Sequence, residues 1–516
     1  MQISYTANYL KIYFWQGVSL VLNFLALFIV VPYLSSQPVI YGLYSVCIGL
    51  AIFLSYADLG FLSAGSKYAA EYHAQGNKKK EAETIGFTGF ILSIFLFLLA
   101  CFFIYCSFNP DLIIKDLVIG QETKIASSLF LILALSVPSA LLQRILQIIF
   151  SIRLEDYVIQ RINIIGSLIR IVSVFFFFAN GAYQIVGYYA FTQIVIFIIS
   201  LVSLYIARRR YSYNFIDLFK NFRFSQEIFN KVKPLALSSL FLTVCWILYY
   251  EIDPFVIGKI SGAEKVSFFA IGLTLLGFFR SLFGIVFSPF SARFNHFIGQ
   301  RDIEGLKIFF FEIVKTFVPL VVFPIICLVI LASPFVLSWV GFQYQDSIII
   351  VRWLLLCNLF AFITYPVSML LMGLERVKEM YLISAIITVT YWLGVSLSYA
   401  NWGLKSFAIF KFIAFFISAI AYIFFAAKFL NMSVRNFIYQ VTKTLIIPMA
   451  FLVISSYIVV GYLPLEKSKE NLFVVLATAG IILSLTFIIQ VLFSRESREK
   501  IADILYNLKK KKYESY

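Results

Sequence analysis

Ionisable side chains inside long apolar runs are the residues of this sequence whose types could do chemistry. The chain has 516 residues, of which 61% are apolar and 13% are charged. A charge in the hydrocarbon of a membrane costs about 2.5–3.5 kcal/mol on insertion scales, so such a group usually faces a protein interior or a wet cavity. The basic residues inside the apolar runs include Arg144, Arg161, Arg170, Arg280, Lys315, Arg352, Lys405 and Lys411. The acidic ones are fewer and include Asp58, Glu251 and Asp253.

The excess of bases over acids in these runs predicts an anionic ligand. Guanidinium groups match phosphate oxygens in a two-pronged geometry and are weakly hydrated, which suits a diphosphate. Arg280 lies in the middle of its apolar run and is the strongest candidate for a cation that lines a cavity. Arg170 lies in the body of another run, Arg352 lies near the end of a third, and Lys315 completes this candidate set.

Four further bases lie nearer to the ends of their runs. A long basic side chain close to a helix end can reach the lipid headgroups instead of a cavity. For Arg144 and Arg161 we leave both interpretations open, and we include them among the candidates for binding the ligand. For Lys405 and Lys411 we favour the headgroup interpretation.

The three acids are candidates for pairing with a cavity cation or for carrying a coupling ion. Asp58, followed by Gly60, is deep enough in its run for either role, and the sequence does not decide between them. Glu251 and Asp253 lie near the end of a later run. We therefore expect proton or sodium coupling as an option, and no other cofactor and no metal centre.

The elements that must position these residues are transmembrane helices. Backbone polar groups cannot stay unpaired in hydrocarbon, so long apolar runs form helices, and each crossing needs about 20 residues. Apolar runs of this length recur fourteen times along the chain, and the second, seventh and eighth lie at 39–62, 234–257 and 266–290. The sequence predicts an all-α integral membrane protein with about 14 transmembrane helices.

The distribution of Lys and Arg predicts the orientation of these helices. Most of the 42 basic residues fall in segments that lie inside the cell when the amino terminus is placed inside, as the positive-inside rule requires. Both termini are then cytoplasmic. The net charge is +16, but the basic residues lie in short segments between apolar runs and do not form a separate basic domain. No nucleic-acid partner is therefore expected.

Two basic segments interrupt the apolar pattern and should lie on the anionic inner leaflet. They are the linker at 208–233 and the tail at 495–516. The expected organisation is an N-lobe of six helices at 1–207, the linker at 208–233, a C-lobe of six helices at 234–428, two further helices at 429–494 and the tail at 495–516.

A short internal repeat supports two related lobes. His73, Gly76 and Glu81 share their spacing with His296, Gly299 and Glu304, at an offset of 223 residues. Each segment follows the second helix of a six-helix set. An even number of helices in each copy relates the two lobes by a pseudo-twofold axis along the membrane normal, with the substrate route between them. For both histidines we favour a solvated structural position over proton coupling.

An aromatic cluster follows in the seventh run, where Trp246, Tyr249 and Tyr250 lie close together. Such rings could stack on sugar faces, but we favour an interfacial belt, where aromatic residues are enriched.

Several segments resemble the signatures of Wzx-type polysaccharide and O-antigen flippases. They are Pro32–Ser36, Tyr41–Tyr44, Asp58–Phe61, Lys67–Tyr72 with Gly76, and Asp253–Gly258, which resembles the seventh-helix motif. This family belongs to the superfamily that also contains the multidrug and toxin extruders and the lipid II flippases. The resemblance departs from the family pattern at Pro254, directly after Asp253.

The resemblance implies a MATE-like fold with two six-helix lobes around a central cavity. It further implies alternating access and a cargo of undecaprenyl-diphosphate oligosaccharide, moved from the cytoplasmic to the outer leaflet of a bacterial inner membrane. Membrane lipids and other glycan-assembly proteins are the implied partners. The competing hypotheses are an ion-coupled multidrug extruder on the same scaffold and a membrane glycan polymerase, although no large outer loop or nucleophile constellation favours an enzyme.

Overall fold

The computed structural model describes residues 5–58, 60–118, 120–211 and 213–494. Helices account for 86% of the structure, and no strand occurs within these four ranges. The all-α fold is therefore confirmed. The basic tail at 495–516, which we expect on the inner leaflet, lies outside the described residues.

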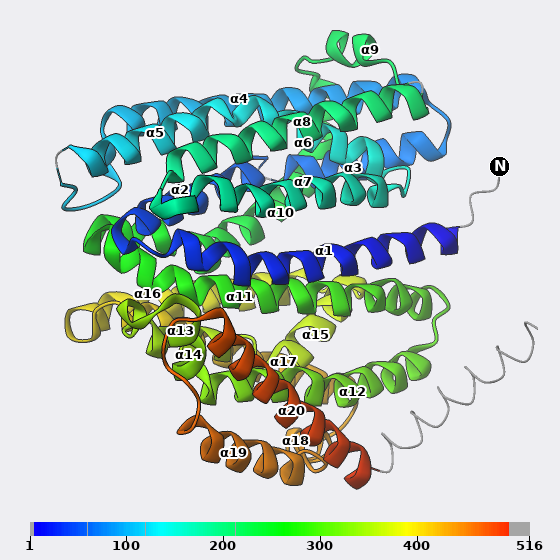
Figure 1. The fold of residues 1–516 in the computed structure, drawn as a ribbon. Coiled ribbons are helices and arrows are strands. Elements are labelled where there is room, and N and C mark those ends of the chain that lie inside the picture. Colours follow the sequence, from blue (N-terminus) through cyan, green and yellow to red (C-terminus); the bar gives the residue numbers. More distant parts are fainter. Residues whose placement is uncertain (1–4, 59, 119, 212, 495–516) are drawn as a thin grey trace, which may run out of the picture. The chain divides into compact units, whose positions relative to one another are not determined.

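The chain divides into two compact units, Met1–Ala270 and Ile271–Tyr516. The helices α1 to α10 belong to unit 1 and are labelled in Figure 1. They are α1 (Tyr5–Leu34), α2 (Pro38–Tyr56), α3 (Phe61–Ala74), α4 (Lys78–Phe108), α5 (Gln121–Leu135), α6 (Val137–Ser151), α7 (Asp156–Phe177), α8 (Ile185–Tyr211), α9 (Phe215–Lys220) and α10 (Gln226–Trp246). A π-helical turn at Ile247–Glu251 follows α10, and α11 (Asp253–Gly299) continues from unit 1 into unit 2.

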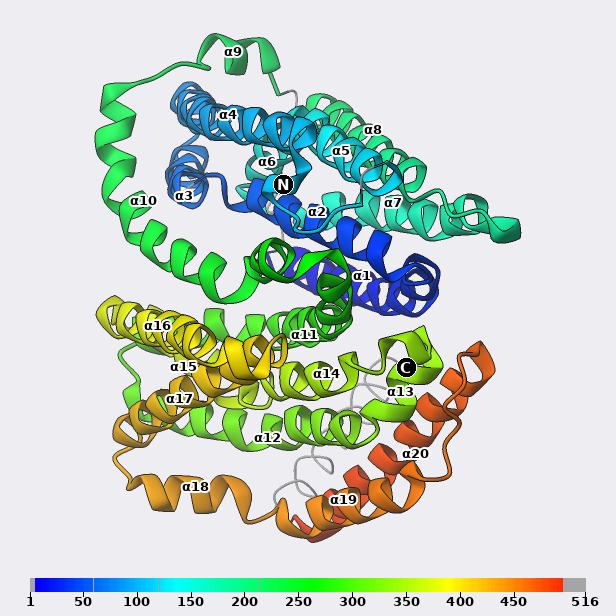
Figure 2. The ribbon, with the colours of Figure 1, turned by 90° about the vertical axis from the view of Figure 1, so that its left-hand side faces the viewer.

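Unit 2 contains the remaining helices, which Figure 2 shows with their labels. They are α12 (Ile303–Ile330), α13 (Ala332–Val340), α14 (Ser347–Leu356), α15 (Ala361–Gly373), α16 (Val377–Trp402), α17 (Lys405–Phe429), α18 (Val434–Thr442), α19 (Ile446–Val460) and α20 (Lys469–Phe493). Short 3-10 turns connect consecutive helices within the units and lie at Pro110–Leu112, Ala179–Gly181 and Phe342–Tyr344.

The number of membrane spans agrees with the expected architecture. By length and hydropathy, 11 helices within the described residues could cross a membrane, or up to 13 when two bent helix pairs each count as one span. The stretch Gln226–Gly299 counts once in that total although it is 74 residues long. Because one crossing needs about 20 residues, this stretch is long enough for the two spans expected at 234–257 and 266–290, which gives fourteen. The helical path breaks between them at Gly262, where φ is 80°.

The first two turns of α11 pack with unit 1. The backbone N–H of Lys115, in the loop after α4, donates to the carbonyl oxygen of Gly258 at 2.9 Å. The ammonium of Lys259 donates to the carbonyl oxygen of Asp111 in the same loop at 3.3 Å. These contacts group residues 234–270 with unit 1, whereas we assigned that segment to the C-lobe from the sequence.

The second apolar run is broken in its body. Helix α2 ends at Tyr56 and α3 begins at Phe61, with Gly60 in the left-handed region at a φ of 85°. The Asp58 carboxylate accepts hydrogen bonds from the backbone N–H groups of Gly60 and Leu62 at 3.1 and 3.0 Å. A carboxylate at this position satisfies N–H groups that the start of a helix leaves without partners. Asp58 therefore stabilises the beginning of α3.

The linker keeps the amphipathic character that its sequence predicts. Helix α9 lies beside α4 in both views of the molecule (Figures 1 and 2), and Phe222 contacts the ring of Phe90 at 6.1 Å between centroids. On α9, Ile216 and Phe219 are 68% and 73% exposed next to Lys220. Its binding to an anionic leaflet stays a prediction.

The repeat is visible in two pairs of turns, but its register differs from the sequence match. In the α3–α4 turn the left-handed residue is Gly76, followed by Asn77, which caps α4. In the α11–α12 turn the left-handed residue is Arg301, followed by Asp302, which caps α12. The structural offset is therefore 225 residues, and the expected offset of 223 was wrong. The structural counterpart of Glu81 is Leu306.

A second pair of turns extends the correspondence. Leu154 is left-handed between α6 and α7, with a φ of 55°, and Glu375 is left-handed between α15 and α16, with a φ of 57°. The two turns also share their backbone hydrogen bonds, from Leu154 to Ser151 and from Glu375 to Met372. The residue before each left-handed position is Arg153 in unit 1 and Leu374 in unit 2.

Candidate functional site

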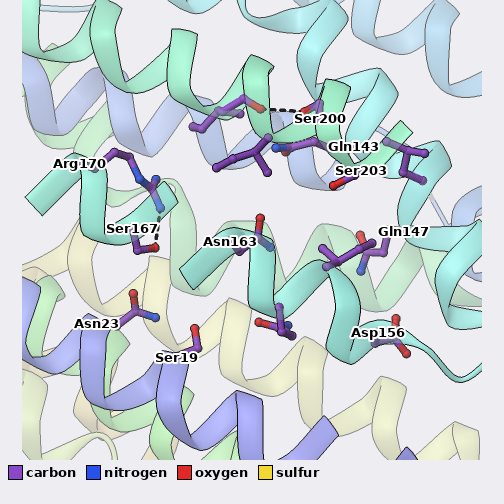
Figure 3. A pocket seen from close by; sticks show the side chains of 15 residues that line it. Ser19, Asn23, Gln143, Gln147, Asp156, Asn163, Ser167, Arg170, Ser200 and Ser203 are labelled. Atoms are coloured by element: carbon purple, nitrogen blue, oxygen red, sulfur yellow. Dashed lines mark hydrogen bonds between the residues drawn. The ribbon is translucent and has the colours of Figure 1, made fainter. Parts of the chain in front are cut away.

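A polar pocket lies inside unit 1 and is the candidate functional site. Its volume is about 410 Å³, and side chains from four helices converge on it (Figure 3). The lining residues are Ser19 and Asn23 of α1, Gln143, Leu146 and Gln147 of α6, Asp156, Ile159, Gln160, Asn163, Ser167 and Arg170 of α7, and Ile196, Ile199, Ser200 and Ser203 of α8. A polar cavity of this size in a mainly apolar helical unit is costly, because hydroxyl and amide groups lose water on burial.

Helix α7 contributes the largest share of the polar lining. Its residues Asp156, Gln160, Asn163, Ser167 and Arg170 follow one another at intervals of four, three, four and three. This spacing places all five on one face of an α-helix. The opposite face is apolar, and Ile165 and Val172 on it are 59% and 64% exposed. The helix therefore presents one polar stripe to the pocket.

Arg170 supplies the cation of the pocket. One of its terminal nitrogens, Nη2, donates to the Ser167 hydroxyl at 2.9 Å, and Nε donates to the carbonyl oxygen of Gly166 at 3.4 Å. Both contacts hold the side chain along its own helix, and Figure 3 shows the one to Ser167. A guanidinium has five N–H donors, so the two hydrogen bonds that Arg170 makes among the described residues leave donors for an anionic ligand.

The shape of the pocket near Arg170 depends on a close helix contact. A Cβ atom at Gly166 would lie 2.0 Å from Cδ1 of Ile199, which lines the pocket from α8. Real Cβ atoms do not approach other heavy atoms so closely. The absence of a side chain at Gly166 therefore lets α8 bring Ile199 against α7.

The remaining lining can recognise a neutral polar ligand. Asn and Gln each carry a carbonyl acceptor and an NH₂ donor, and Ser carries a hydroxyl that does both. These groups surround the space between Arg170 and Asp156, which are fourteen residues apart on α7 and therefore about 21 Å apart along its axis. The arrangement suits a ligand with many hydroxyl or amide groups and an anionic end.

Of the other arginines expected in unit 1, one is connected to the pocket. Nη1 of Arg144 donates to Oε1 of Gln147 at 3.1 Å, and Gln147 lines the pocket. Arg161 is exposed and its guanidinium lies 5.0 Å from the ring centroid of Trp15. Arg144 thus orients a lining residue, whereas Arg161 does not line this pocket.

The acids at the end of α10 lie in an aromatic setting. Glu251 is 6% exposed and Asp253 is fully buried. The indole N–H of Trp246 donates to Oε1 of Glu251 at 3.2 Å, and the ring of Trp246 contacts Tyr250 at 4.4 Å between centroids. Because Tyr249 is only 7% exposed, at least this ring of the aromatic cluster is buried in the protein. π-Helical turns of this kind are frequent at functional sites.

Three of the predicted cations lie in unit 2. The backbone carbonyl oxygen of Arg280 accepts from the Tyr365 hydroxyl at 3.0 Å, and its side chain is partly buried. The ammonium of Lys315 lies 5.2 Å from the ring centroid of Phe311. Nε of Arg352 is buried and has no hydrogen-bond partner among the residues that the structure describes. Their role in ligand binding stays a prediction.

Lys405 and Lys411 differ from each other. Lys405 is exposed at the first residue of α17, in agreement with the headgroup interpretation. Lys411 is only 1% exposed, and its ammonium lies 5.0 Å from the ring centroid of Tyr391. The headgroup interpretation was therefore wrong for Lys411, because its position on α17 faces α16 and not the lipid.

Unit 2 contains a different kind of cavity, an apolar groove of about 460 Å³. It lies between α12, the break from α14 to α15, and the bend from α18 to α19. The lining residues are Val318, Val322, Ile326, Leu359, Phe360, Phe362, Thr442, Leu445, Ile446, Met449 and Val453. Only one hydroxyl, that of Thr442, interrupts this lining, so the groove suits an alkyl or prenyl chain.

Comparison with known proteins assigns the fold. No protein-family model and no curated protein sequence matches the chain. A solved structure of the lipid II flippase MurJ, in an inward closed conformation, is similar over 95% of this chain and 99% of its own, with a TM-score of 0.68 and 13% identity. An inward-facing multidrug resistance MATE family transporter of the MOP superfamily is similar over 80% of this chain and 94% of its own, with a TM-score of 0.59 and 16% identity.

A third structure shares the fold at lower similarity. It is a MOP superfamily transporter from Pyrococcus furiosus, described with a binding pocket of reverse polarity that suggests a different function. It covers 82% of this chain and 94% of its own, with a TM-score of 0.51 and 17% identity. The chain thus has the MATE-like fold that the sequence predicts, and the narrower resemblance to Wzx-type flippases stays a prediction.

Proposed function

We propose that this protein is a flippase that moves a lipid-linked oligosaccharide diphosphate from the cytoplasmic to the outer leaflet of a bacterial inner membrane. The observation that carries the proposal is the pocket of unit 1, where Arg170 accompanies five carboxamide side chains and four serines. A guanidinium pairs with phosphate oxygens, and amides and hydroxyls pair with sugar hydroxyls. The pocket thus matches both polar parts of such a cargo.

The apolar groove of unit 2 supports the lipid part of the proposal. A prenyl chain is apolar along its whole length, and burying each methylene-sized group contributes about 0.8 kcal/mol. The groove between α12 and α19 offers such a surface while the pocket offers a polar one. The apolar tail of such a cargo gains from a surface of this kind, whereas a water-soluble ligand does not.

The fold similarity supports a transport mechanism with alternating access. One similar structure is described as a lipid II flippase, and another as a multidrug resistance transporter. In the proposed cycle the diphosphate and glycan are held by polar side chains, the tail stays on apolar surfaces such as the groove, and the lobes expose the cargo to each side in turn. The buried acids Glu251 and Asp253 are the candidates for coupling to protons or sodium. Both termini are cytoplasmic in this proposal.

A second candidate function is an ion-coupled multidrug extruder. Asp156 in the pocket favours it, because a carboxylate can pair with a cationic drug. The two functions differ in which end of α7 binds the charged part of the ligand. Arg170 is essential for an anionic cargo and Asp156 for a cationic one.

The test is a transport assay in vesicles that contain the purified full-length protein and a defined lipid-linked glycan diphosphate. Loss of a charged hydrogen bond costs about 1.5–3 kcal/mol, so Arg170→Ala should lower the initial rate about ten- to a hundredfold. Arg161→Ala is the matched control, because Arg161 lies on the same helix but is exposed. Equal rates for both variants would remove the pocket from the proposal. Transport of a cationic dye that depends on Asp156 would favour the extruder.

The central role predicted for Arg280 is tested in the same assay. Arg280→Ala should also lower the rate if its side chain binds the diphosphate. An unchanged rate with Arg280→Ala and a reduced rate with Arg170→Ala would place the anion in unit 1 alone.

A further inference from the structure

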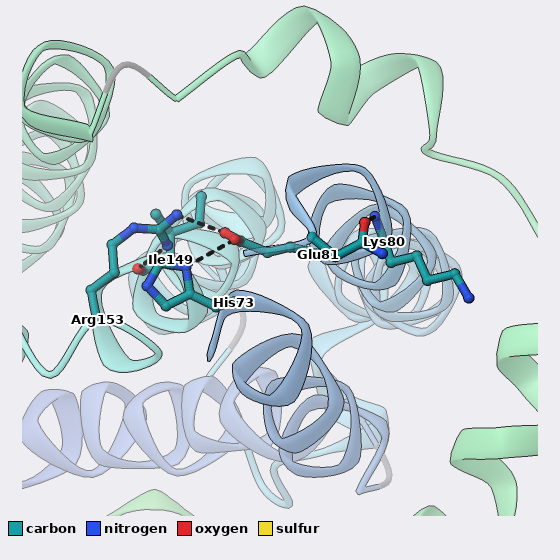
Figure 4. Close-up of polar contacts among 6 residues, drawn as sticks. His73, Lys80, Glu81, Ile149 and Arg153 are labelled. Carbon is teal, nitrogen blue, oxygen red and sulfur yellow. Dashed lines mark hydrogen bonds and ion pairs between the residues drawn. The ribbon is translucent and has the colours of Figure 1, made fainter. Parts of the chain in front are cut away.

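A buried carboxylate organises one end of unit 1 and plays no part in the pocket. Glu81, in the first turn of α4, has a side chain that is only 3% exposed. Its Oε1 pairs with Nη2 of Arg153 at 2.6 Å, and its Oε2 contacts Nδ1 of His73 at 3.0 Å (Figure 4). These three side chains come from the end of α3, the start of α4 and the α6–α7 turn. One carboxylate thus connects three elements.

A second group of side chains surrounds Arg153. Its Nη1 donates to the carbonyl oxygen of Ile149 at 2.8 Å, and its guanidinium lies 5.0 Å and 5.4 Å from the ring centroids of Tyr211 and Tyr213. Burial, together with the Glu81 carboxylate, raises the pKa of Tyr213, so this phenol keeps its proton at physiological pH. Arg153 therefore also holds the end of α8 and the start of the linker.

The same turn carries a second acid, Glu155, which connects the turn to the end of α8. Glu155 lies two residues after Arg153 and pairs with Nε of Arg210 at 2.7 Å. The Tyr211 hydroxyl also donates to Glu155. If Arg153 separates from Glu81, its guanidinium still lies over two aromatic rings. The cost of separation is thereby reduced.

Unit 2 shows that the fold does not need charges at this place. The structural counterparts of Glu81 and Arg153 are Leu306 and Leu374, and Leu306 is fully buried. Well-packed apolar residues are often as stable as a buried ion pair, or more stable, because the ions lose their hydration. The charged network in unit 1 is therefore not explained by stability alone.

We propose that Glu81, Arg153 and His73 form a latch that closes this end of unit 1 and opens during transport, while unit 2 stays closed at the matching place. An ion pair can be hydrated and formed again when its elements separate, whereas two exposed leucines gain nothing from water. Opening separates the α3–α4 turn from the α6–α7 turn within unit 1. The basic-residue distribution predicts that this end is cytoplasmic. The inference rests on the proposed transport function for its place in a cycle.

The test measures distances between spin labels in the full-length protein in lipid vesicles. The six native cysteines are replaced, and labels are attached at Gln75 and Arg161, which are exposed and flank the latch. The matched control pair in unit 2 is Gln300 and Leu382, at the corresponding offsets from the two turns and also exposed. We expect two distances for the unit 1 pair and one distance for the unit 2 pair.

The decisive variant transfers the apolar residues of unit 2 to unit 1. In Glu81→Leu with Arg153→Leu, we expect the longer unit 1 distance to disappear and the transport rate to fall about tenfold or more, as for couplings between two-state elements. If that variant does not fold, Arg153→Lys serves instead, because it keeps the charge but loses the fork and the stacking. We expect Arg153→Lys to populate the longer distance more.

A single distance for unit 1 of the unmodified protein, with and without cargo, would overturn the latch. Two distances that persist in the leucine variant would overturn it as well. Because the distances can be measured without cargo, this experiment tests the latch separately from the proposed function. An unmodified protein that shows two distances but moves no lipid-linked glycan would contradict the proposed function and leave the latch standing.

Discussion

The α3–α4 turn of unit 1 and the α11–α12 turn of unit 2 have the same backbone course but different interiors. Behind the first turn lies the carboxylate of Glu81, paired with Arg153, and behind the second lies Leu306. The larger cavities differ in the same sense, since unit 1 contains the polar pocket around Arg170 and unit 2 contains the apolar groove beside Met449. At the matching turns, the same backbone course thus carries charged side chains in unit 1 and an apolar one in unit 2.

This difference teaches that a repeat fixes backbone geometry and leaves the interior free to specialise. The turns keep a left-handed residue and a capping side chain, because these satisfy the backbone at the start of the next helix. The side chains behind the turns obey no such requirement. In each copy, apolar side chains can therefore replace a charged pair, provided that both partners of the pair change together.

The largest expected effect comes from breaking the ionic pair on one side only. Arg153→Leu leaves the buried Glu81 carboxylate with His73 as its remaining side-chain partner, which should cost up to about 3–5 kcal/mol of stability. Addition of Glu81→Leu should restore most of that loss. The midpoint of unfolding of the purified protein measures both changes, with Arg161→Leu as an exposed control. A small loss for Arg153→Leu would show that His73 or water compensates the Glu81 charge without Arg153, contrary to the role given to the pair.

A smaller effect is expected in the pocket. Asn163→Leu keeps a similar volume but removes a carboxamide, and one hydrogen bond is worth about 0.5–1.5 kcal/mol. The apparent affinity for the lipid-linked glycan should fall by up to about tenfold while stability stays the same or rises. Vesicle transport at several cargo concentrations measures this, and Ile165→Leu on the exposed face of α7 is the control. An unchanged affinity would indicate that the glycan binds elsewhere.

The groove should respond to the length of the lipid and not to its head. Met449→Ser removes apolar surface, and about 0.8 kcal/mol is lost for each methylene that a tail can no longer bury. We expect a loss of about fourfold in affinity for a long-chain cargo and little change for a short-chain analogue. Ile454→Ser, which is exposed on the same helix and does not line the groove, is the control. Equal losses for both chain lengths would argue against tail binding.

The smallest effect belongs to the second copy of the repeated motif. Glu304 pairs with Lys307 at 2.8 Å, but its side chain is 80% exposed. Exposed ion pairs contribute little, so Glu304→Gln should change stability by less than about 0.5 kcal/mol and leave transport unchanged. The same unfolding and transport assays measure it. A large effect would mean that the sequence match with Glu81 reflects a shared role after all.

The helices were predictable because long apolar runs admit no other structure in hydrocarbon. Even the break before α3 is marked in the sequence by Asp58 and Gly60. The register of the repeat was not predictable. The sequence match paired Gly76 with Gly299, whereas the second turn places Arg301 in the left-handed region. An arginine at that φ carries no signal that sequence inspection can find.

The candidate site was predictable only in part. Arg170 was named because a charge in an apolar run is conspicuous, but the amides around it were overlooked. The intervals from Asp156 through Asn163 to Arg170 follow a helical face, and that periodicity is the signal that could have revealed the pocket. The burial of Lys411 depends on which face of α17 meets Tyr391, and no local pattern contains that information.

The absence of a side chain at Gly166 makes the width of the pocket easy to change by substitution. Ile199 fills the space that any side chain at this position would need. A change at either of these two residues would alter the width of the compartment beside Arg170 without touching a single hydrogen-bonding group. If the pocket binds a glycan, as we propose, one or two apolar substitutions here could adapt it from a slender sugar to a bulkier one while the hydrogen-bonding side chains stay the same.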